Sequence, residues 1–286
     1  MKKYFFLMRL DKPIGFMLLF WPCSWSFAVI LYENSLSEKW LIYIFLFFIG
    51  SVLMRSAGCV YNDIIDKKID QQVKRTKSRP VASNKVSILN AWLLTILLSF
   101  LSLIILFQFN NTAILFGLSS GLLIILYPFM KRITYWPQLF LGIVFNWGVI
   151  LTFLVFDKNI NLEIILIYFS AILWTLGYDT IYGLQDIEDD LKINVKSTAI
   201  KFKNNIKLFL ANIYLSSIFL IITANILILN SIKLEMILYL IPLSLLIFQI
   251  KSVKLRNSTK NLFLFKLNNY YGLSIFIIQI LIFNHA

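Results

Sequence analysis

Two groups of carboxylates interrupt an otherwise apolar chain of 286 residues. The first group lies at residues 62–70, with the sequence NDIIDKKID, and the second lies at residues 179–190, with the sequence DTIYGLQDIEDD. Together they hold more than half of the 14 acidic residues in the chain. Ionisable side chains at the edge of a membrane are costly and usually face a polar cavity. The two groups therefore predict a shared site for a cation, most simply a metal ion.

The acidic residues recur at the spacing of helix turns. Asn62, Asp66 and Asp70 are each four residues apart, and four residues also separate Asp186 from Asp190. Residues four apart are offset by only about 40° around an α-helix, so each group forms a stripe along one helix face. Two such stripes can supply ligands to the same ion from two sides.

The available ligand atoms are oxygens. Asp179, seven residues before Asp186, joins the second stripe if its helix continues. Cys23 and Cys59 lack the spacing of a metal site or of a disulfide framework, and His285, the single histidine, lies next to the carboxy terminus. Hard oxygen ligands suit Mg²⁺, which takes one or two carboxylates and is completed by waters and phosphate oxygens. Ca²⁺ fits less well because the chain has no EF-hand-like loop.

Basic residues near the stripes favour an anionic substrate. Arg75 and Arg79 follow the first stripe, and Lys131 and Arg132 fall at the same predicted membrane surface. Arginine suits phosphate because its guanidinium is a planar fork of donors. Carboxylates, Mg²⁺ and these cations together fit a diphosphate, and the membrane supplies its apolar tail, so a lipid diphosphate is the predicted substrate class. The competing interpretation is that these charges are solvated helix caps, which the pairing of two stripes at one surface disfavours.

Membrane helices must position these residues. The chain is 59% hydrophobic, above the usual share in soluble domains. Stretches of about 20 apolar residues cross a bilayer as helices, and we expect them at 14–32, 40–61, 87–108, 112–130, 136–156, 163–182, 207–229, 233–250 and 270–284. The prediction is an all-α polytopic membrane protein of about nine transmembrane helices, with a single domain over residues 1–286.

Charge in the loops predicts the orientation. Most of the 27 basic residues fall before the first predicted span and in every second loop after it. The positive-inside rule places those loops and the amino terminus in the cytoplasm, and the carboxy terminus outside. The amino terminus lacks a signal peptide, because Arg9 and Asp11 interrupt a short apolar run, and it shows no transit peptide. We therefore expect a mature chain that starts near Met1 and lies in a bacterial inner membrane.

Arg55 is a further costly residue, because it lies inside an apolar stretch about two helical turns before Asn62. It is either a structural partner of a buried carboxylate such as Asp179 or an anchor for an anionic group of the substrate, since arginine can bind a carboxylate through two parallel hydrogen bonds. Gly58, Gly121 and Gly177 are expected to allow neighbouring helices to approach closely.

Several motifs resemble those of the UbiA-type membrane prenyltransferases. The two acidic groups resemble the two aspartate-rich motifs of that family. Further motifs resemble the branch of the family that uses 4-hydroxybenzoate. They are RLDKPIG at 9–15 with FWP at 20–22, KRT at 74–76 with RP at 79–80, YPFMKR at 127–132 with PQ at 137–138, KSTAI at 196–200, and NNY at 268–270 with GL at 272–273. The resemblance covers nearly the whole chain.

The resemblance implies a helical bundle around a central cavity that is capped by cytoplasmic loops. It implies Mg²⁺-dependent transfer of a polyprenyl group from polyprenyl diphosphate to the ring of 4-hydroxybenzoate, in ubiquinone synthesis. The lipid bilayer is the other expected partner, with no nucleic acid and no obligate protein partner.

The resemblance also assigns roles by position. The expected metal ligands are Asn62, Asp66, Asp70, Asp186 and Asp190. The expected diphosphate contacts are Arg9 or Lys12, Arg75, Arg79 and Lys131. Near the acceptor we expect Arg55 to face its carboxylate and Asp179 to polarise its phenol, with Tyr127 and Tyr182 lining the substrate site. The expected catalytic residues are Asp66, Asp179, Asp186 and Arg55.

Two alternatives remain open. A sister enzyme would prenylate another acceptor, such as a naphthoate or haem. A transporter of cations or lipid diphosphates would use the carboxylates as its binding site. Transport sites usually lie near the centre of the bilayer, whereas both predicted stripes lie at one surface.

Overall fold

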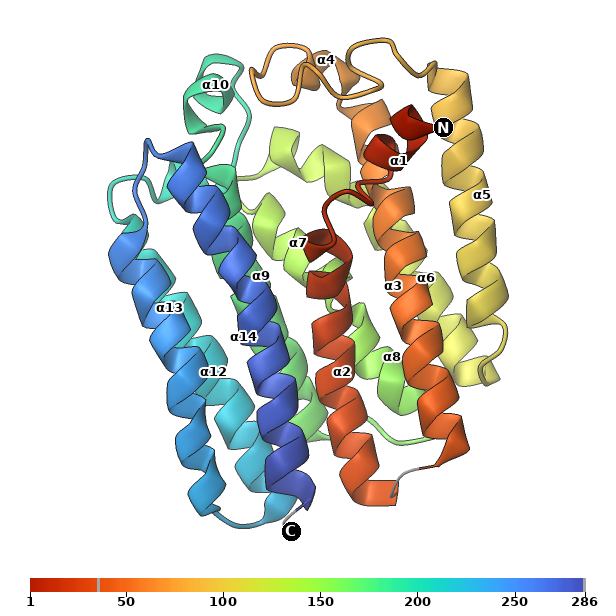
Figure 1. The fold of residues 1–286 in the computed structure, drawn as a ribbon, viewed down its shortest axis with the longest axis vertical. Helices are drawn as coiled ribbons and strands as arrows, with labels where there is room; N and C mark the ends of the chain where they lie inside the picture. The colour runs from red at the N-terminus through yellow and green to blue at the C-terminus, as the bar shows by residue number, and fades with distance from the viewer. Residues whose placement is uncertain (35–36, 285–286) are drawn as a thin grey trace.

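The computed structural model describes residues 1–34 and 37–284, which form helices without a β-strand (Figure 1). The first half contains α1 (Lys2–Leu7), α2 (Ile14–Asn34), α3 (Glu38–Ile65), α4 (Lys67–Asp70), α5 (Ile88–Leu106), α6 (Asn111–Ile133), α7 (Pro137–Phe145) and α8 (Trp147–Val155). The second half contains α9 (Leu162–Gly183), α10 (Ile187–Lys192), α11 (Thr198–Lys201), α12 (Ile206–Leu229), the 3₁₀-helix η1 (Leu234–Tyr239), α13 (Leu240–Ser252) and α14 (Ser258–Asn284). The prediction of an all-α protein is confirmed, and His285 lies outside the described residues.

Eight segments of the described chain are long and apolar enough to cross a membrane. They are 14–33, 38–65, 88–106, 111–133, 137–155, 162–183, 206–229 and 234–252, each close to a predicted span. The ninth predicted span, 270–284, is the second half of α14, which begins earlier, at Ser258. Hydropathy missed the first half because Lys260 and Lys266 lie in it, so nine is an approximate number of membrane helices.

The predicted span 136–156 is two helices, divided at Asn146. Asn146 leaves the helical conformation, with φ −98° and ψ 9°. Its buried amide donates to the carbonyl of Gly142 at 2.7 Å and to the hydroxyl of Thr175 at 2.9 Å. Asparagine side chains compete in this way with the backbone ladder of a helix, so one polar residue breaks an otherwise apolar stretch and ties it to α9.

Helix α9 is the centre of the bundle. It packs against α12, α7, α14, α8 and α2. The ring of Trp174 on α9 packs at a tilt against the rings of Trp25 and Tyr271, with centroid distances of 5.2 and 5.0 Å, and its indole nitrogen donates to Asn268 at 2.8 Å. These rings form the core that holds the cavity-lining end of α9 in place.

The three glycines expected at helix contacts behave differently. A Cβ at Gly177 would lie 2.2 Å from the ring of Tyr214, so the predicted close approach is confirmed there. At Gly58 and Gly121 a Cβ would meet no atom of another described segment within 4 Å, so the prediction is wrong for both. Gly58 instead lines an apolar cavity of about 410 Å³ between α3, α5 and α6.

Both cysteines are free and buried. Cys23 lies against the backbone of α8, where a Cβ at Gly148 would be 2.3 Å from its sulfur. Cys59 lies on α3 and is 6% exposed.

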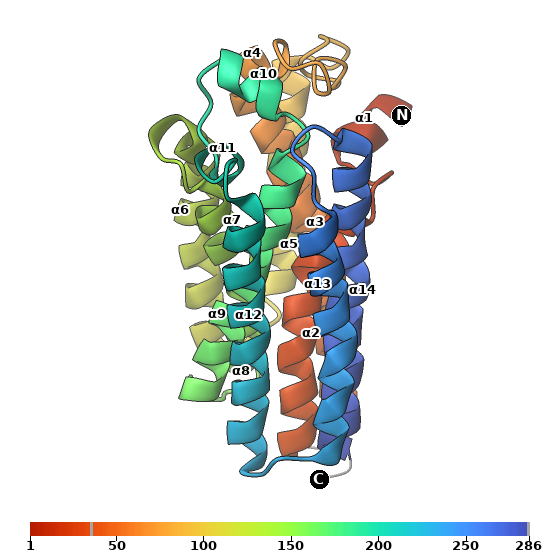
Figure 2. The ribbon, with the colours of Figure 1, turned by 90° about the vertical axis from the view of Figure 1, so that its left-hand side faces the viewer.

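One end of the bundle carries the polar loops. The connection between α3 and α5, with α4, and the connection between α9 and α12, with α10 and α11, lie at the same end as the amino terminus (Figures 1 and 2). The last helix, α14, ends at the opposite end (Figure 1). Both acidic stretches therefore lead into one cap, as the sequence predicted.

Candidate active site

A cavity of about 180 Å³ opens at the capped end, between the ends of α3, α6 and α9. Residues from both acidic stretches line it, together with basic and phenolic side chains. The predicted site residues among its lining are Asn62, Asp66, Asp70, Arg75, Arg79, Tyr127, Lys131, Asp179, Tyr182, Asp186 and Asp190. The structure thus brings together side chains that lie more than 100 residues apart in the chain.

The first stripe crosses a helix break. Helix α3 ends at Ile65, and Asp66 turns the chain into α4 with φ −95° and ψ 6°. The amide of Asp66 still donates to the carbonyl of Asn62 at 2.9 Å, and the amide of Asp70 donates to that of Asp66 at 2.8 Å. The four-residue spacing therefore persists across the break, and all three side chains line the cavity.

Asp66 is the most deeply buried member of the cavity's carboxylates, with 1% of its surface exposed. Lys131 from the end of α6 donates to one of its oxygens, and Arg132 donates to the other at 3.2 Å. Burial raises the pKa of Asp66 above its usual range, and the Lys131 ammonium partly offsets that rise. Two cations of α6 thus hold the carboxylate that directly follows α3 at the cavity wall.

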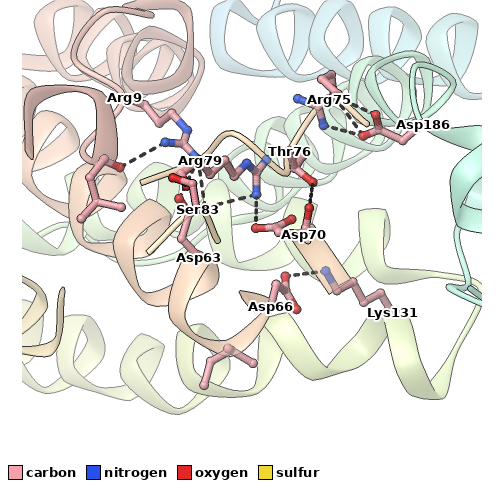
Figure 3. A network of polar contacts seen from close by, with 12 residues as sticks. Arg9, Asp63, Asp66, Asp70, Arg75, Thr76, Arg79, Ser83, Lys131 and Asp186 are labelled. Carbon is pink, nitrogen blue, oxygen red and sulfur yellow. Dashed lines mark hydrogen bonds and ion pairs between the residues drawn. The ribbon is translucent and has the colours of Figure 1, made fainter. Parts of the chain in front are cut away.

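Two arginines and two carboxylates form a connected network beside this pair (Figure 3). Arg79 donates to Asp70 at 2.8 Å and to Asp63 at 3.1 Å. Arg9 donates to both oxygens of Asp63, at 2.9 and 2.8 Å. Neither Arg9 nor Asp63 lines the cavity, and the exposed Lys12 does not line it either.

Asp63 was not among the predicted site residues. It follows Asn62 directly, so it projects away from the stripe that the four-residue spacing defines. The signal that could have found it is its position as an additional acid within a stretch already assigned to the site, since a carboxylate in such a place needs a cationic partner.

The second stretch also crosses a break, because α9 ends at Gly183 and α10 begins at Ile187. Asp179 is therefore not joined to Asp186 by one continuous helix, yet both line the cavity. Arg75 binds Asp186 with its fork, with Nε 2.8 Å from one carboxylate oxygen, and it also donates to the Tyr182 hydroxyl at 2.8 Å. One arginine of the first capping loop thus binds two side chains of the second stretch.

Asp190 completes the second stripe. Burial, and next the charge of Asp186, raise the pKa of Asp190 to about 7. No ion pair to Asp190 is found in the described part of the chain. It is therefore a half-buried carboxyl in the cavity that would gain from a bound cation.

Arg55 lies within α3, below the cavity and not in its lining. Its Nε is buried and has no hydrogen-bond partner among the residues that the structure describes, and its guanidinium lies 5.4 Å from the ring centroid of Phe145. No ion pair joins it to Asp179 within residues 1–34 and 37–284. The interpretation of Arg55 as a direct partner of Asp179 therefore has no contact to support it.

The donor set fits a hard cation that arrives with further ligands. In the described residues, no three His, Cys, Asp or Glu side chains lie close enough to hold a metal ion by themselves. The cavity nevertheless offers carboxylate and amide oxygens from two stretches, facing basic side chains. Mg²⁺ commonly takes one or two carboxylates and completes its shell with water and phosphate oxygens, so this set fits Mg²⁺ bound together with a phosphorylated substrate.

Known proteins share this sequence pattern. A model of the UbiA prenyltransferase family matches residues 19–270. The mitochondrial 4-hydroxybenzoate polyprenyltransferase of Drosophila melanogaster is 47% identical over 213 residues, which are 73% of this chain and 53% of that protein. The human protein of the same name is 42% identical over 212 residues, which are 74% of this chain and 57% of that protein. The chain spans about half the length of the curated relatives it matches.

Solved structures share the fold. An apo UbiA homolog from Aeropyrum pernix K1 superposes with a TM-score of 0.75 at 22% identity, covering 93% of this chain and 97% of that one. A UbiA homolog from Archaeoglobus fulgidus bound to GPP and Mg²⁺ superposes with a TM-score of 0.68 at 15% identity, covering 99% of each chain. At these identities the likeness establishes the helical architecture.

Proposed function

The chain belongs to the UbiA prenyltransferase family, and we propose that it transfers a polyprenyl group from polyprenyl diphosphate to the ring of 4-hydroxybenzoate, as a step of ubiquinone synthesis. The observation that carries the proposal is the cavity at the capped end, where carboxylates of two stretches face Arg75, Arg79 and Lys131. The names of the curated relatives support this acceptor. The proposal assigns the whole activity to one domain, residues 1–286.

The carboxylates would hold Mg²⁺ with the diphosphate. The ligands assigned are Asn62, Asp66, Asp70, Asp186 and Asp190, all of which line the cavity. When bound, Mg²⁺ supplies positive charge that stabilises the departing diphosphate. The Archaeoglobus fulgidus homolog, bound to GPP and Mg²⁺, supports this cofactor for the fold.

The diphosphate contacts are best assigned to Arg75, Arg79 and Lys131. Each of the three lines the cavity and already binds a carboxylate there, Asp186, Asp70 or Asp66. Their positive charges are fixed before the substrate arrives, which is the arrangement that stabilises developing negative charge with the least reorganisation.

Of the two remaining candidates for diphosphate contact, Arg9 is engaged by Asp63 and Lys12 is exposed. Both lie outside the cavity lining.

The acceptor is assigned to the inner side of the cavity. Arg55 has a buried Nε without a partner in the described part of the chain. An unpaired buried donor costs about 1–3 kcal/mol, and the carboxylate of 4-hydroxybenzoate would satisfy it. Asp179 would polarise the phenol, with Tyr127 and Tyr182 lining the same space. These assignments place the acceptor ring between α3, α6 and α9.

The reaction then follows from charge. The bond between the allylic carbon and the diphosphate oxygen breaks, and the diphosphate leaves with the electron pair. The ring carbon beside the phenol hydroxyl attacks the allylic cation, and a base removes the ring proton. The allylic cation must be kept from water, and the capping loops with the surrounding apolar helices provide that shelter.

The apolar helices and the family together make this an integral membrane protein. We assign the capped end to the cytoplasmic side, because most basic residues lie in loops of that end. The bacterial inner membrane expected from the sequence gains no support from the relatives, whose names are mitochondrial.

Product identity tests the proposal. Membranes that contain the protein are given Mg²⁺, a mixture of polyprenyl diphosphates and either 4-hydroxybenzoate, a naphthoate or haem, and the products are identified by mass spectrometry. We expect prenylated 4-hydroxybenzoate. Turnover of another acceptor without turnover of 4-hydroxybenzoate would overturn the assignment, and diphosphate flux into liposomes without any product would favour a transporter.

A further inference from the structure

Asp63 makes charged contacts on two sides but takes no part in the cavity lining. Its side chain is 2% exposed at the end of α3. Arg9 of the amino-terminal segment binds both of its oxygens, and Arg79 of the first capping loop binds one of them (Figure 3). A buried carboxylate is costly unless it is paired and hydrogen-bonded. Asp63 therefore depends on both arginines, and both arginines are held by it.

Arg79 connects Asp63 to the cavity. A single guanidinium nitrogen, Nη1, donates to Asp63 at 3.1 Å and to Asp70 at 2.8 Å. Arg79 and Asp70 line the cavity, so Asp63 stands behind Arg79 as seen from the cavity. An arginine side chain has many rotamers when it is unrestrained. Asp63 holds Arg79 from outside the cavity lining, and Asp70 accepts from the same nitrogen within it, so the two carboxylates together fix the position of this guanidinium.

Arg9 connects Asp63 to the amino-terminal segment. Arg9 has a positive φ of 58°, which a residue with a side chain adopts only where its surroundings enforce it. Its Nη1 donates to the carbonyl of Phe6 at 2.8 Å, while its Nη2 binds Asp63. The guanidinium thus closes the turn after α1 and fastens that turn to the end of α3.

We propose that Asp63 is a positioning residue for the diphosphate site. Through Arg79 it prepares the cavity for the anion, and through Arg9 it fastens the amino-terminal segment to the same network. The inference rests on the proposed function, because the anion is the diphosphate of the prenyl donor. Asp63→Asn keeps the size of the side chain and one acceptor oxygen but removes the charge that holds both arginines.

Binding of a donor analogue tests the inference without turnover. The full-length protein is purified in detergent with Mg²⁺, and the Kd of farnesyl thiodiphosphate, which resists cleavage, is measured by calorimetry. We expect about a tenfold weaker Kd for Asp63→Asn, which corresponds to about 1.4 kcal/mol, and at least as large a loss for Arg79→Gln. In steady-state assays the KM for the donor should rise by the same factor, while the KM for the aromatic acceptor stays unchanged.

A double variant separates positioning from a general structural role. If Asp63 acts through Arg79, Asp63→Asn adds no further loss of analogue binding to Arg79→Gln, because interacting residues are not additive. The matched control is Asp11→Asn, which removes an exposed carboxylate of the same amino-terminal segment and should leave the Kd unchanged.

Other outcomes of these binding measurements would contradict either the inference or the proposed function. Additive losses in the double variant, or an unchanged Kd in Asp63→Asn, would overturn the inference. A wild-type protein that does not bind the analogue would overturn the proposed function, and the inference with it. If Asp63→Asn does not fold, Arg9→Gln leaves Asp63 in place and releases one of its partners. A loss of about threefold in analogue binding is then expected, and an unchanged Kd for that variant would contradict the network.

Discussion

The two helices that carry the acidic stretches differ in their surroundings. In the most apolar part of α9, 67% of residues are buried inside the bundle, whereas the corresponding share in α3 is 22%. At the capped ends of the two helices the order is reversed, because the carboxylates at the end of α3 have more ion-pair partners. Asp63, Asp66 and Asp70 at the end of the outer helix are each bound by at least one basic side chain. Beyond the central helix, Asp186 has Arg75, while Asp190 forms no ion pair among the described residues.

The difference suggests that the two helices are held in place by different interactions. The peripheral helix gains its fixed position at the cavity from ion pairs, because less of it is held by packing. The central helix is already held by Trp174 and its aromatic neighbours, independently of the ion pairs that follow it. Asp190 lines the cavity, and no ion pair to it is found among the described residues. We infer that the second stretch offers the more open side of the cavity to an incoming cation.

The largest effect is expected when a carboxylate is removed from either acidic stretch of the cavity. Asp66→Ala and Asp186→Ala should each lower turnover by about 10³-fold or more, because preorganised charge is usually the largest catalytic contribution. Product formation by the purified variants measures this. Glu188→Ala is the control, since that carboxylate of the second stretch is 64% exposed and should have little effect. Near-normal kcat in either folded variant would contradict the metal assignment.

The next effect concerns the acceptor. Arg55→Ala removes the guanidinium of α3 whose Nε is buried, and it should raise the KM for the aromatic acceptor by roughly 30-fold, since losing a buried charged partner costs about 2–5 kcal/mol. The KM for the prenyl diphosphate should change far less. Steady-state kinetics with each substrate varied in turn measures both constants. Equal effects on the two would indicate that Arg55 supports the structure rather than the acceptor.

A smaller effect tests the bridge between the two sides. Arg75→Lys keeps the charge but loses the fork that binds Asp186 and Tyr182, so the KM for the donor should rise about tenfold. Arg256→Lys is the matched control, because its ion pair with Glu188 is exposed and worth little. If both variants behave alike, the geometry of the Arg75 fork has no importance for the donor.

The smallest effect compares the packing of the two helices directly. Gly177→Ala on α9 forces a Cβ against the ring of Tyr214, and overpacking of this kind costs about 1–3 kcal/mol. Gly58→Ala on α3 meets nothing within 4 Å and should leave stability unchanged or raise it by up to about 1 kcal/mol. Thermal unfolding in detergent measures both. Equal shifts of the melting temperature in the two variants would contradict the packing difference between the central helix and the outer helix.

Much of this arrangement could be predicted from local sequence. Runs of apolar residues located the spans, and the four-residue spacing placed Asn62, Asp66 and Asp70 on one face. The role of Asp63 could not be predicted in that way, because Arg9 lies 54 residues away and Arg79 lies 16 residues away in the chain. Such partners are set by how the segments fold back on one another.

The packing of the helices could not be predicted from local sequence either. Gly58 and Gly177 both lie in apolar stretches of sequence, yet Gly58 lines the apolar cavity between α3, α5 and α6, whereas Gly177 faces the ring of Tyr214. The break at Asn146 needed Thr175, which belongs to the neighbouring helix. A single polar residue in an apolar run carries no information about which helix will face it.

The burial of Cys23 and Cys59 makes the sidedness of the protein open to chemical measurement. Membrane-impermeant maleimides cannot readily reach either thiol, so the natural chain serves as its own unreactive background. A cysteine introduced at exposed Lys203, in a loop of the capped end, or at exposed Ser231, in the connection between α12 and η1, would be the one thiol in water. Labelling in sealed vesicles of known orientation would then show which compartment supplies the diphosphate and receives it back.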